Sequence, residues 1–375
     1  MSIVFITVYL LNKLIMKTGI HSVLVLCKTL MKGGAEKQAM ITAKLLAQQG
    51  MSVSILIWDG SSMDKANLRF LEDQQISCLG LRGSLFNKFT DFINHLRQQN
   101  VTLILSYLSL ANFLGALAGI YKHNLITVGG IRSEKLPYFK FIVERFVHNR
   151  LNNRTIFNSY AAKDRFEGRG FNSGKSAVIH NAVITYRNNN VVRNDDEIIL
   201  ISVSRFIESK DYPTALKAFR YLVDKYPVKK MKFLIVGYGK CEKSIRVFIK
   251  KYGLESNIQM IIDPPNISEL LACSDIYLST SLVEGLSNSI MEAMAAGLPV
   301  VATDVGDNRF LIEDSKNGYI VPCRSADVIA HKLEHLILFN DIRKKFGEYS
   351  YWKIRNEFTE KHMLKKYMEL IDELT

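Results

Sequence analysis

Two carboxylates, Glu284 and Glu292, stand eight residues apart across a turn that leads into a predicted helix. Gly285, Ser287 and Asn288 lie between them, where a helix start requires a flexible backbone and a side-chain cap. Because the first turn of a helix leaves backbone N–H groups unpaired and carries partial positive charge, this turn can bind phosphate. The two carboxylates cannot be stacked neighbours, so each can accept hydrogen bonds from different hydroxyls, one set from a hexose and the other from a ribose. The pattern predicts a pocket for a sugar phosphate.

Apolar residues surround these carboxylates and predict a helix that is buried on most sides. They are Leu286, Ile290, Met291, Ala293, Met294, Ala295 and Ala296. A solvated helix face is the alternative interpretation. Since a buried carboxylate without a partner is costly, we expect Glu284 and Glu292 to serve a ligand.

Two cations follow the first predicted strand of the C-terminal half, residues 198–203. Arg205 comes two residues after this strand and Lys210 seven. A guanidinium makes forked hydrogen bonds and an ammonium is a compact charge, so the two together suit a diphosphate. Ordinary surface charge is the alternative. The next predicted strand, residues 232–236, runs into the turn Gly237-Tyr-Gly239.

The N-terminal half has a comparable cluster in residues 129–134, directly after a predicted strand at 125–128. Arg132 of this cluster can hold an acceptor phosphate or the donor, and Glu134 stands beside it. A surface ion pair is the alternative. The Gly33-Gly34 loop could let the backbone approach either ligand, although two glycines are more often only a turn. A G-x-G-x-x-G pattern is absent, which argues against a nicotinamide-dependent dehydrogenase.

Strands and helices alternate through both halves of the chain. This alternation predicts an α/β fold with two doubly wound parallel sheets, which bind ligands at the carboxyl ends of their strands. A polar, asparagine-rich stretch at 181–196 marks the boundary between them. We therefore expect domains at 16–190 and 191–357, with a final helical segment, 358–375, that packs back on the first domain. Residues 1–15 are an uncertain extension, either an upstream translation product or a weak interfacial helix, and their apolar run is too short to span a bilayer.

Charge and cysteine usage limit the possible partners. Residues 1–190 hold 23 Lys and Arg against 10 Asp and Glu, whereas residues 191–375 hold 26 of each, so the whole net charge of +13 lies in the first half. A basic half favours an anionic partner, and without a nucleic-acid-binding motif we expect an anionic membrane surface rather than nucleic acid. A generic basic surface is the alternative. The five cysteines lack disulfide or metal-ligand spacing and are expected to be reduced thiols in a cytosol.

These motifs together resemble the signature of retaining glycosyltransferase family 4. The C-terminal part of the resemblance runs from Ser274 through Glu284 and Glu292 to residues 297–302, then Gly306 and residues 317–322. Upstream it includes residues 202–219, 233–239 and 33–36, so it covers nearly the whole chain. The resemblance implies the GT-B fold, in which two Rossmann-like domains face each other across a cleft, and a nucleoside-diphosphate sugar as donor, with a UDP-sugar favoured.

The resemblance also implies roles for individual residues. Arg205, Lys210 and Glu284 are expected to act in catalysis by stabilising the leaving diphosphate and holding the sugar. The expected donor-binding residues are Gly34, Gly237, Gly285, Leu286, Ser287, Asn288, Ser289 and Glu292. No cofactor is expected, and because an Asp-x-Asp motif is absent the cations are expected to replace a metal ion.

The chain departs from the family pattern at two places. Many members carry a histidine near the reacting sugar, where this chain has Arg132 and Glu134, which we assign to the acceptor side. Residues 263–266, Asp-Pro-Pro-Asn, stand where many members have a glycine-containing loop, which leaves the nucleobase open.

The expected function is transfer of a sugar, with retention, to a hydroxyl of a lipid-linked surface-polysaccharide glycan at the cytosolic face of the inner membrane. A sugar-nucleotide epimerase or hydrolase of the same fold and a non-catalytic membrane-associated scaffold are the main alternatives. A metal-dependent transferase of the other major glycosyltransferase fold would need the missing acidic motif.

Overall fold

The computed structural model describes residues 20–133, 135–183 and 197–375. Residues 1–15, Glu134 and residues 184–196 of the polar stretch lie outside the described residues. Contacts divide the chain into two compact units. Unit 1 comprises the chain up to Ala182 together with Glu360–Thr375, and unit 2 comprises Val183–Thr359. The division therefore falls at Ala182, ahead of the boundary at 190 that the sequence analysis placed in the polar stretch.

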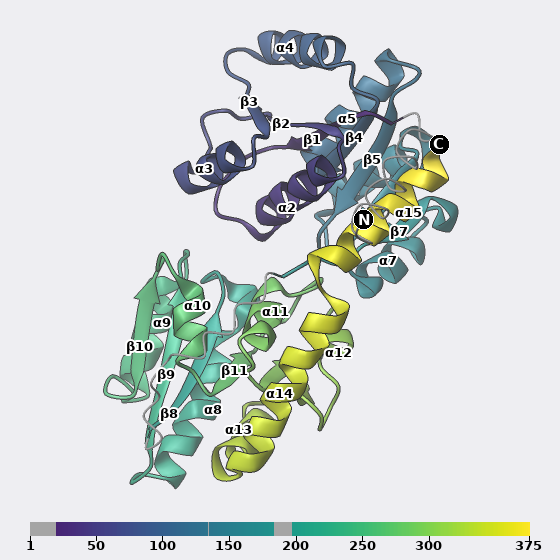
Figure 1. Cartoon of the computed structure of the whole chain (residues 1–375). Coiled ribbons are helices and arrows are strands. Elements are labelled where there is room, and N and C mark those ends of the chain that lie inside the picture. The colour runs from purple at the N-terminus through teal and green to yellow at the C-terminus, as the bar shows by residue number, and fades with distance from the viewer. Residues whose placement is uncertain (1–19, 134, 184–196) are drawn as a thin grey trace, which may run out of the picture. The chain divides into compact units, whose positions relative to one another are not determined.

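Unit 1 is built on a parallel sheet that contains seven strands within the described residues, in the order β3-β2-β1-β4-β5-β6-β7 (Figure 1). The strands are β1 (Ser22–Cys27), β2 (Ser52–Ile57), β3 (Ser77–Gly80), β4 (Leu103–Tyr107), β5 (Ile126–Ile131), β6 (Arg154–Phe157) and β7 (Ser176–Val178). The chain moves outward from β1 to β3 and then returns to the other side of β1 with β4. The point between β1 and β4 is thus the switch point of this sheet.

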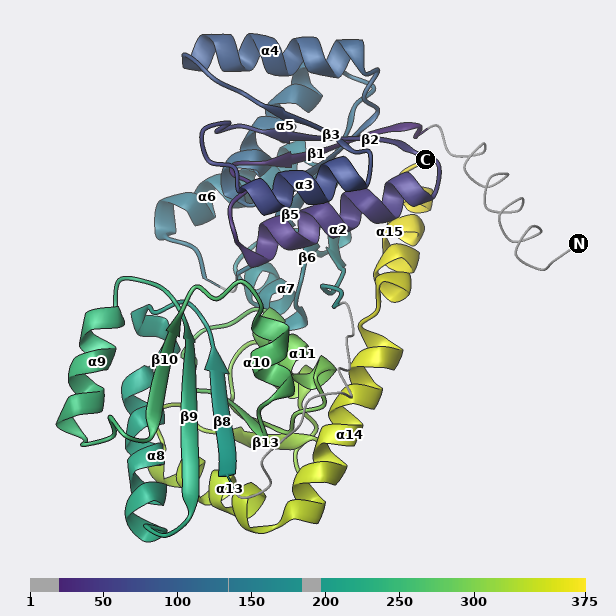
Figure 2. The ribbon, with the colours of Figure 1, turned by 60° about the vertical axis from the view of Figure 1, so that its left-hand side comes forward.

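Helices cover both faces of the unit 1 sheet (Figure 2). They are α2 (Gly34–Gln48), α3 (Lys65–Asp73), α4 (Leu85–Gln98), α5 (Ser109–Tyr121), α6 (Tyr138–Phe146), α7 (Tyr160–Glu167) and α15 (Glu360–Leu374), with a π-helical turn at Val147–Leu151 and a 3-10 turn at Ser173–Lys175. Alternation along β1 explains the two layers. Val23 and Val25 pack with residues of α2, whereas Leu24 and Leu26 pack with residues of α4 and α5.

The C-terminal helix α15 belongs to the core of unit 1. Met363, Tyr367, Leu370 and Ile371 are buried against β1, β4 and α2. At the start of α15 the Lys44 ammonium of α2 donates a hydrogen bond to the Glu360 carboxylate, and the two charges form an ion pair with an N–O distance of 2.9 Å. The last turns of the chain therefore complete the hydrophobic layer of the first sheet.

Unit 2 repeats the architecture with a six-stranded parallel sheet in its described residues, in the order β10-β9-β8-β11-β12-β13. The strands are β8 (Glu197–Val203), β9 (Lys230–Gly237), β10 (Ile258–Ile262), β11 (Ile276–Ser279), β12 (Val300–Thr303) and β13 (Gly318–Val321). Its helices are α8 (Tyr212–Lys225), α9 (Glu242–Lys251), α10 (Ile267–Ala272), α11 (Asn288–Ala295), α12 (Asn308–Leu311), α13 (Ala326–Leu338) and α14 (Asn340–Glu357), and a 3-10 turn lies at Glu208–Lys210. Two doubly wound parallel sheets confirm the predicted fold class.

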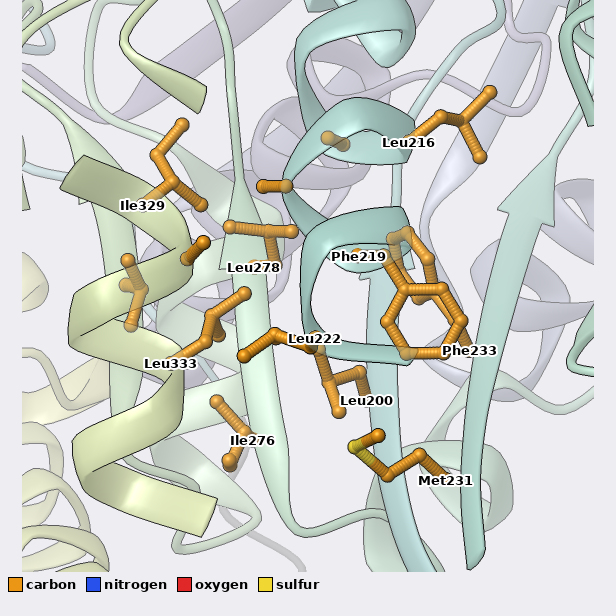
Figure 3. Close-up of a cluster of buried hydrophobic side chains, with 14 of the residues drawn as sticks. Leu200, Leu216, Phe219, Leu222, Met231, Phe233, Ile276, Leu278, Ile329 and Leu333 are labelled. Atoms are coloured by element: carbon orange, nitrogen blue, oxygen red, sulfur yellow. The ribbon is translucent and has the colours of Figure 1, made fainter. Parts of the chain in front are cut away.

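One face of the unit 2 sheet packs on α8 and α13 (Figure 3). Leu222 and Phe219 of α8 and Leu333 of α13 meet Leu200 of β8 and Ile276 of β11 there, all without solvent exposure. The opposite face holds Ile201 and Val203 against α11. Burial on both faces is why these strands read as nearly continuous apolar runs in the sequence.

The structure corrects the position of the glycine pair at 129–130. The sequence predicts that the strand ends at residue 128, but β5 continues through Ile131, so Gly129 and Gly130 lie inside the strand. A β-carbon on Gly130 would lie 2.5 Å from the carbonyl oxygen of Ser106 on β4, and one on Gly129 would lie 2.5 Å from the Asn152 amide nitrogen. The glycines therefore serve close packing of the strand, and Arg132 is the first residue beyond it.

None of the described helices combines the length and the apolar character needed to cross a lipid bilayer.

We predict that Leu222→Ala lowers the free energy of unfolding by about 2–5 kcal/mol, because it leaves a cavity in this core. Urea denaturation measures the change. Val247→Ala on α9, whose side chain is 66% exposed, is the control and should change stability by less than about 0.5 kcal/mol. Equal effects of the two substitutions would contradict the assignment of the core.

Candidate functional site

The order in which the chain adds strands to the unit 2 sheet reverses between β8 and β11, which are parallel neighbours. Loops that leave the carboxyl ends of these two strands run to opposite sides, and the opening between such loops is where open α/β sheets bind ligands. A small pocket lies at this point. Its lining residues are Ser202, Val203, Ser204, Lys210, Tyr212, Tyr277, Leu278, Ser279, Thr280, Ser281, Glu284 and Ser289. Of the residues singled out in the sequence, the structure thus brings Lys210, Glu284 and Ser289 together.

The loop that carries Lys210 is fastened to the loop after β11. The Leu282 N–H donates to the Ser209 carbonyl at 2.7 Å, and the Thr280 hydroxyl donates to the Lys210 carbonyl at 2.9 Å. Asp211 follows in a left-handed conformation, with φ of 47°, and begins α8. The backbone of Lys210 is therefore held in place by residues about 70 positions further along the chain.

An ion pair joins the two loops across the pocket. The Lys210 ammonium donates a hydrogen bond to the Glu284 carboxylate. The two side chains are only 14% and 13% exposed. Because solvent screens this pair poorly, its charges dominate the electrostatics of the pocket.

The backbone around Glu284 depends on a glycine further along the chain. Gly306 has φ of +56°, and a β-carbon there would lie 2.4 Å from the carbonyl oxygen of Gly285. The next residue, Asp307, donates its N–H to that same carbonyl at 3.0 Å. Only glycine fits this approach, which explains why Gly306 accompanies the Glu284 motif in the sequence.

Arg205 lies at the start of the same loop as Lys210, directly after β8. Its side chain is exposed, and it pairs with no carboxylate within residues 20–133, 135–183 and 197–375. The loop is pinned by the Phe206 N–H, which donates to the Tyr238 carbonyl at 2.7 Å. A β-carbon on Gly237 would lie 1.9 Å from the Ser204 carbonyl, and one on Gly239 2.5 Å from the Phe206 carbonyl. The structure therefore gives Gly237 a role in positioning the Arg205 loop.

Helix α11 begins at Asn288 with Ser287 as its N-cap residue. The sequence predicts a side-chain cap here, but Ser287 makes no cap hydrogen bond and its hydroxyl instead lies 3.3 Å from the Ser289 hydroxyl. Leu286 is buried in the layer between α11 and the sheet, as the apolar pattern predicted. Glu292 is half-buried in the second turn and lies outside the pocket lining.

Hydroxyl-bearing side chains form most of the rest of the pocket, beside Val203 and Leu278, and of these hydroxyl residues only Ser289 was predicted from the sequence. The Tyr277 hydroxyl donates to the Val203 carbonyl at 3.1 Å, and the Ser204 and Tyr212 hydroxyls lie 2.7 Å apart. Burial raises the pKa of Tyr277 and of Tyr212, so both remain neutral. The run Ser279-Thr-Ser281 at the end of a strand was the signal that could have indicated this polar wall.

In unit 1, Arg132 lies in a cage at the end of β5. It donates to the Asn181 side-chain oxygen at 2.8 Å and to the Tyr367 hydroxyl at 3.4 Å, and its guanidinium carbon lies 4.6 Å from the centre of the Tyr107 ring. Burial alone lowers the pKa of Arg132, but Tyr107 and Tyr367 raise it on balance, so the cation persists. No carboxylate of the described residues pairs with it.

The strand that leads to Arg132 is supported from behind by a polar network. Asn112 accepts the Gly130 N–H at 2.8 Å and donates to both carboxylate oxygens of Glu144 at 3.1 Å. Burial raises the pKa of Glu144 to about 7. The network holds the end of β5 in place.

The glycine loop after β1 is partly occupied by a side chain of its own helix. Gly33 is the N-cap residue of α2 and Gly34 its first residue. The Glu36 carboxylate folds back over Gly33, where it accepts a hydrogen bond from Thr29 at 2.9 Å. Gly34 remains exposed beside it. Across the described ranges, His, Cys, Asp and Glu side chains form no cluster of three that could hold a metal ion.

Comparisons with known proteins identify both halves of the chain. Residues 32–187 match the family model "Glycosyltransferase Family 4", and residues 186–353 match "Glycosyl transferases group 1". The putative colanic acid biosynthesis glycosyltransferase WcaL of Salmonella typhimurium is 34% identical over 142 residues, which are 36% of this chain and 34% of that protein. An uncharacterized glycosyltransferase of Haemophilus influenzae is 24% identical over 81% of this chain and 87% of its own length. The chain aligns with less than half of the length of the first curated relatives, at 40%, 34% and 45%.

Among solved structures, Anabaena HepE in complex with UDP and glucose superposes with a TM-score of 0.81. The match covers 93% of this chain and 99% of HepE at 18% identity, so it demonstrates a shared fold.

We predict that Gly306→Ala destabilises the protein more than Gly297→Ala does. Both glycines have positive φ, at +56° and +78°, but the nearest atom to a β-carbon at Gly297 is 3.8 Å away. The difference in unfolding free energy, measured in urea, should be at least about 1 kcal/mol, because only Gly306→Ala forces the Glu284 loop to move. Equal destabilisation would show that the close approach is unimportant.

Proposed function

This chain belongs to the group 1 and family 4 glycosyltransferases, and we propose that it transfers a sugar from a nucleoside-diphosphate sugar to an acceptor hydroxyl. The observation that carries the proposal is the position of the Lys210 and Glu284 pocket. It lies at the switch point of the unit 2 sheet, on the loop that also carries the exposed cation Arg205 and next to the start of α11. A UDP-sugar is the favoured donor, which the complex of HepE with UDP supports as an analogy.

The main electrostatic demand of this reaction is the charge that develops on the leaving diphosphate. Arg205 and Lys210 would take that charge, together with backbone N–H groups at the start of α11. Glu284 would accept hydrogen bonds from the sugar hydroxyls, and Glu292 from the ribose. Gly285, Leu286, Asn288 and Ser289 shape this helix start.

We propose that the reaction retains the anomeric configuration. The acceptor oxygen forms a bond to the anomeric carbon on the face from which the diphosphate departs, and the leaving phosphate oxygen takes the acceptor proton. No acid–base pair is then required of the protein. Since Arg205 and, once it has left Glu284, Lys210 can neutralise the diphosphate, we also propose that transfer needs no metal ion.

The proposed acceptor is a lipid-linked glycan of a surface polysaccharide. The name of the relative WcaL, which refers to colanic acid biosynthesis, supports this class. Arg132 supports it too, because a guanidinium that pairs with no carboxylate among the described residues suits a phosphate on the acceptor.

We further propose that unit 1 lies on an anionic membrane at the cytosolic face. Exposed apolar side chains lie at the first turn of α4 and at the first turn of α6, and because these helices follow the parallel strands β3 and β5, both turns lie toward the carboxyl end of the sheet. They are Leu85 (74% exposed), Phe86 (80%), Tyr138 (76%) and Phe139 (78%). Exposed cations accompany them, namely Arg82, Lys135 and Lys140. Aromatic side chains flanked by lysine and arginine suit the interface of an anionic bilayer.

We predict that the matching nucleotide, among UDP, GDP and ADP, stabilises the protein by about 2.7 kcal/mol at about 100 times its dissociation constant. Thermal shift measures this, and the shift should persist in EDTA. It should disappear in folded Arg205→Ala and Glu292→Ala variants. Arg246→Ala, which removes an exposed cation paired with Glu242 at 2.9 Å on α9, is the control and should keep it. No shift with any nucleotide would favour a non-catalytic scaffold. Hydrolysis or epimerisation of the donor without an acceptor would favour a sugar-nucleotide hydrolase or epimerase.

We predict that the double substitution Tyr138→Ser and Phe139→Ser weakens binding to vesicles containing anionic phosphatidylglycerol by about tenfold or more. Vesicle sedimentation measures the partition coefficient. The matched control removes two exposed apolar side chains of unit 2, through Val228→Ser and Val247→Ser, and should leave binding unchanged. An equal loss in both variants, or no binding by the wild type, would reject this membrane surface.

A further inference from the structure

The two residues proposed to hold opposite ends of the donor are already bonded to each other. Lys210, proposed for the diphosphate, and Glu284, proposed for the sugar, form the ion pair across the pocket. A donor that uses both residues must therefore replace this contact.

The backbone around the pair limits how the contact can open. Hydrogen bonds from Leu282 to Ser209 and from Thr280 to Lys210 hold the two loops together, and Asp307 holds the carbonyl of Gly285. The ammonium and the carboxylate can therefore separate by side-chain rotation while both stay at the edge of the same pocket.

The close approach of Lys210 and Glu284 affects a bare nucleoside diphosphate and a sugar-linked one differently. A bare nucleoside diphosphate that approaches Lys210 brings a second anion beside Glu284, and like charges in a poorly screened pocket repel. When the diphosphate binds Lys210, the Glu284 carboxylate loses the hydrogen bond from the ammonium, and the bare diphosphate supplies no donor to replace it. A sugar on the diphosphate supplies hydroxyl donors, which satisfy the carboxylate.

We propose that Glu284 is an internal counter-ion that makes the site select sugar-linked donors against the bare nucleoside diphosphate. The Lys210–Glu284 ion pair opens when sugar hydroxyls donate to the carboxylate, and it forms again after the sugar has been transferred. The ion pair then favours departure of the diphosphate product. This inference rests on the proposed function and names Glu284 as a specificity-determining residue of that site.

The test compares binding of UDP, GDP and ADP, and of their glucose conjugates, to the wild type and to Glu284→Gln by calorimetry. Glu284→Gln removes the charge but keeps a hydrogen-bonding side chain of nearly the same shape. The matching nucleoside diphosphate should bind this variant about tenfold more tightly than the wild type, because the competing anion is gone. The glucose conjugate should gain less than the bare diphosphate does, so the preference for the conjugate should fall.

Glu208→Gln is the matched control for net charge. Glu208 lies in the same loop as Lys210, but its side chain is 83% exposed and pairs with Lys240 at 3.0 Å. Removing this carboxylate changes the charge of the protein equally, and screening should limit its effect on binding to about twofold. Glu284→Ala is the second variant, with the same expected sign, if Glu284→Gln does not fold.

Weaker or unchanged binding of the bare diphosphate to a folded Glu284 variant would overturn the inference while leaving the donor site intact. Equal tightening in Glu208→Gln would also overturn it, because the effect would then be one of general charge. A wild type that binds neither diphosphate nor conjugate would remove the proposed function and this inference together.

Discussion

The reversal of strand order between β8 and β11 is the constraint on which the site depends. Two parallel strands that sit side by side send their following loops apart, and the pocket opens between those loops. Lys210 lines it from the β8 side, on the loop that also carries Arg205, and Glu284 and Ser289 line it from the β11 side. The charged groups are thus brought together by sheet topology.

Glycine makes this convergence possible. Gly237 and Gly239 let the β9 turn touch the backbone of the Arg205 loop, and Gly306 lets the β12 loop touch the backbone beside Glu284. Each contact supports a loop that carries a charge. These glycines bring backbones close enough to position side chains that could contact a ligand, and the donor-binding role expected for Gly237 stays a prediction.

Much of the fold could be predicted from the sequence. The continuous apolar runs of Ile198–Val203 and similar segments indicate strands buried on both faces, and the family resemblance was confirmed over both halves. The extent of β5 could not be predicted, because glycine at 130 is required by the close approach of the Ser106 carbonyl on the neighbouring strand β4, a contact that the sequence does not reveal. The same limit applies to Lys210 and Glu284, which are 74 residues apart and whose direct pairing is a tertiary contact. The roles of the individual site residues stay predictions.

The most direct test of the account is a crystal structure of the protein with the nucleoside-diphosphate sugar that stabilises it most. We expect diphosphate oxygens within about 3 Å of the Lys210 ammonium and the Arg205 guanidinium, at the carboxyl ends of β8 and β11, with Glu284 turned to the sugar. A diphosphate bound elsewhere, with the Lys210 and Glu284 pair intact, would contradict it.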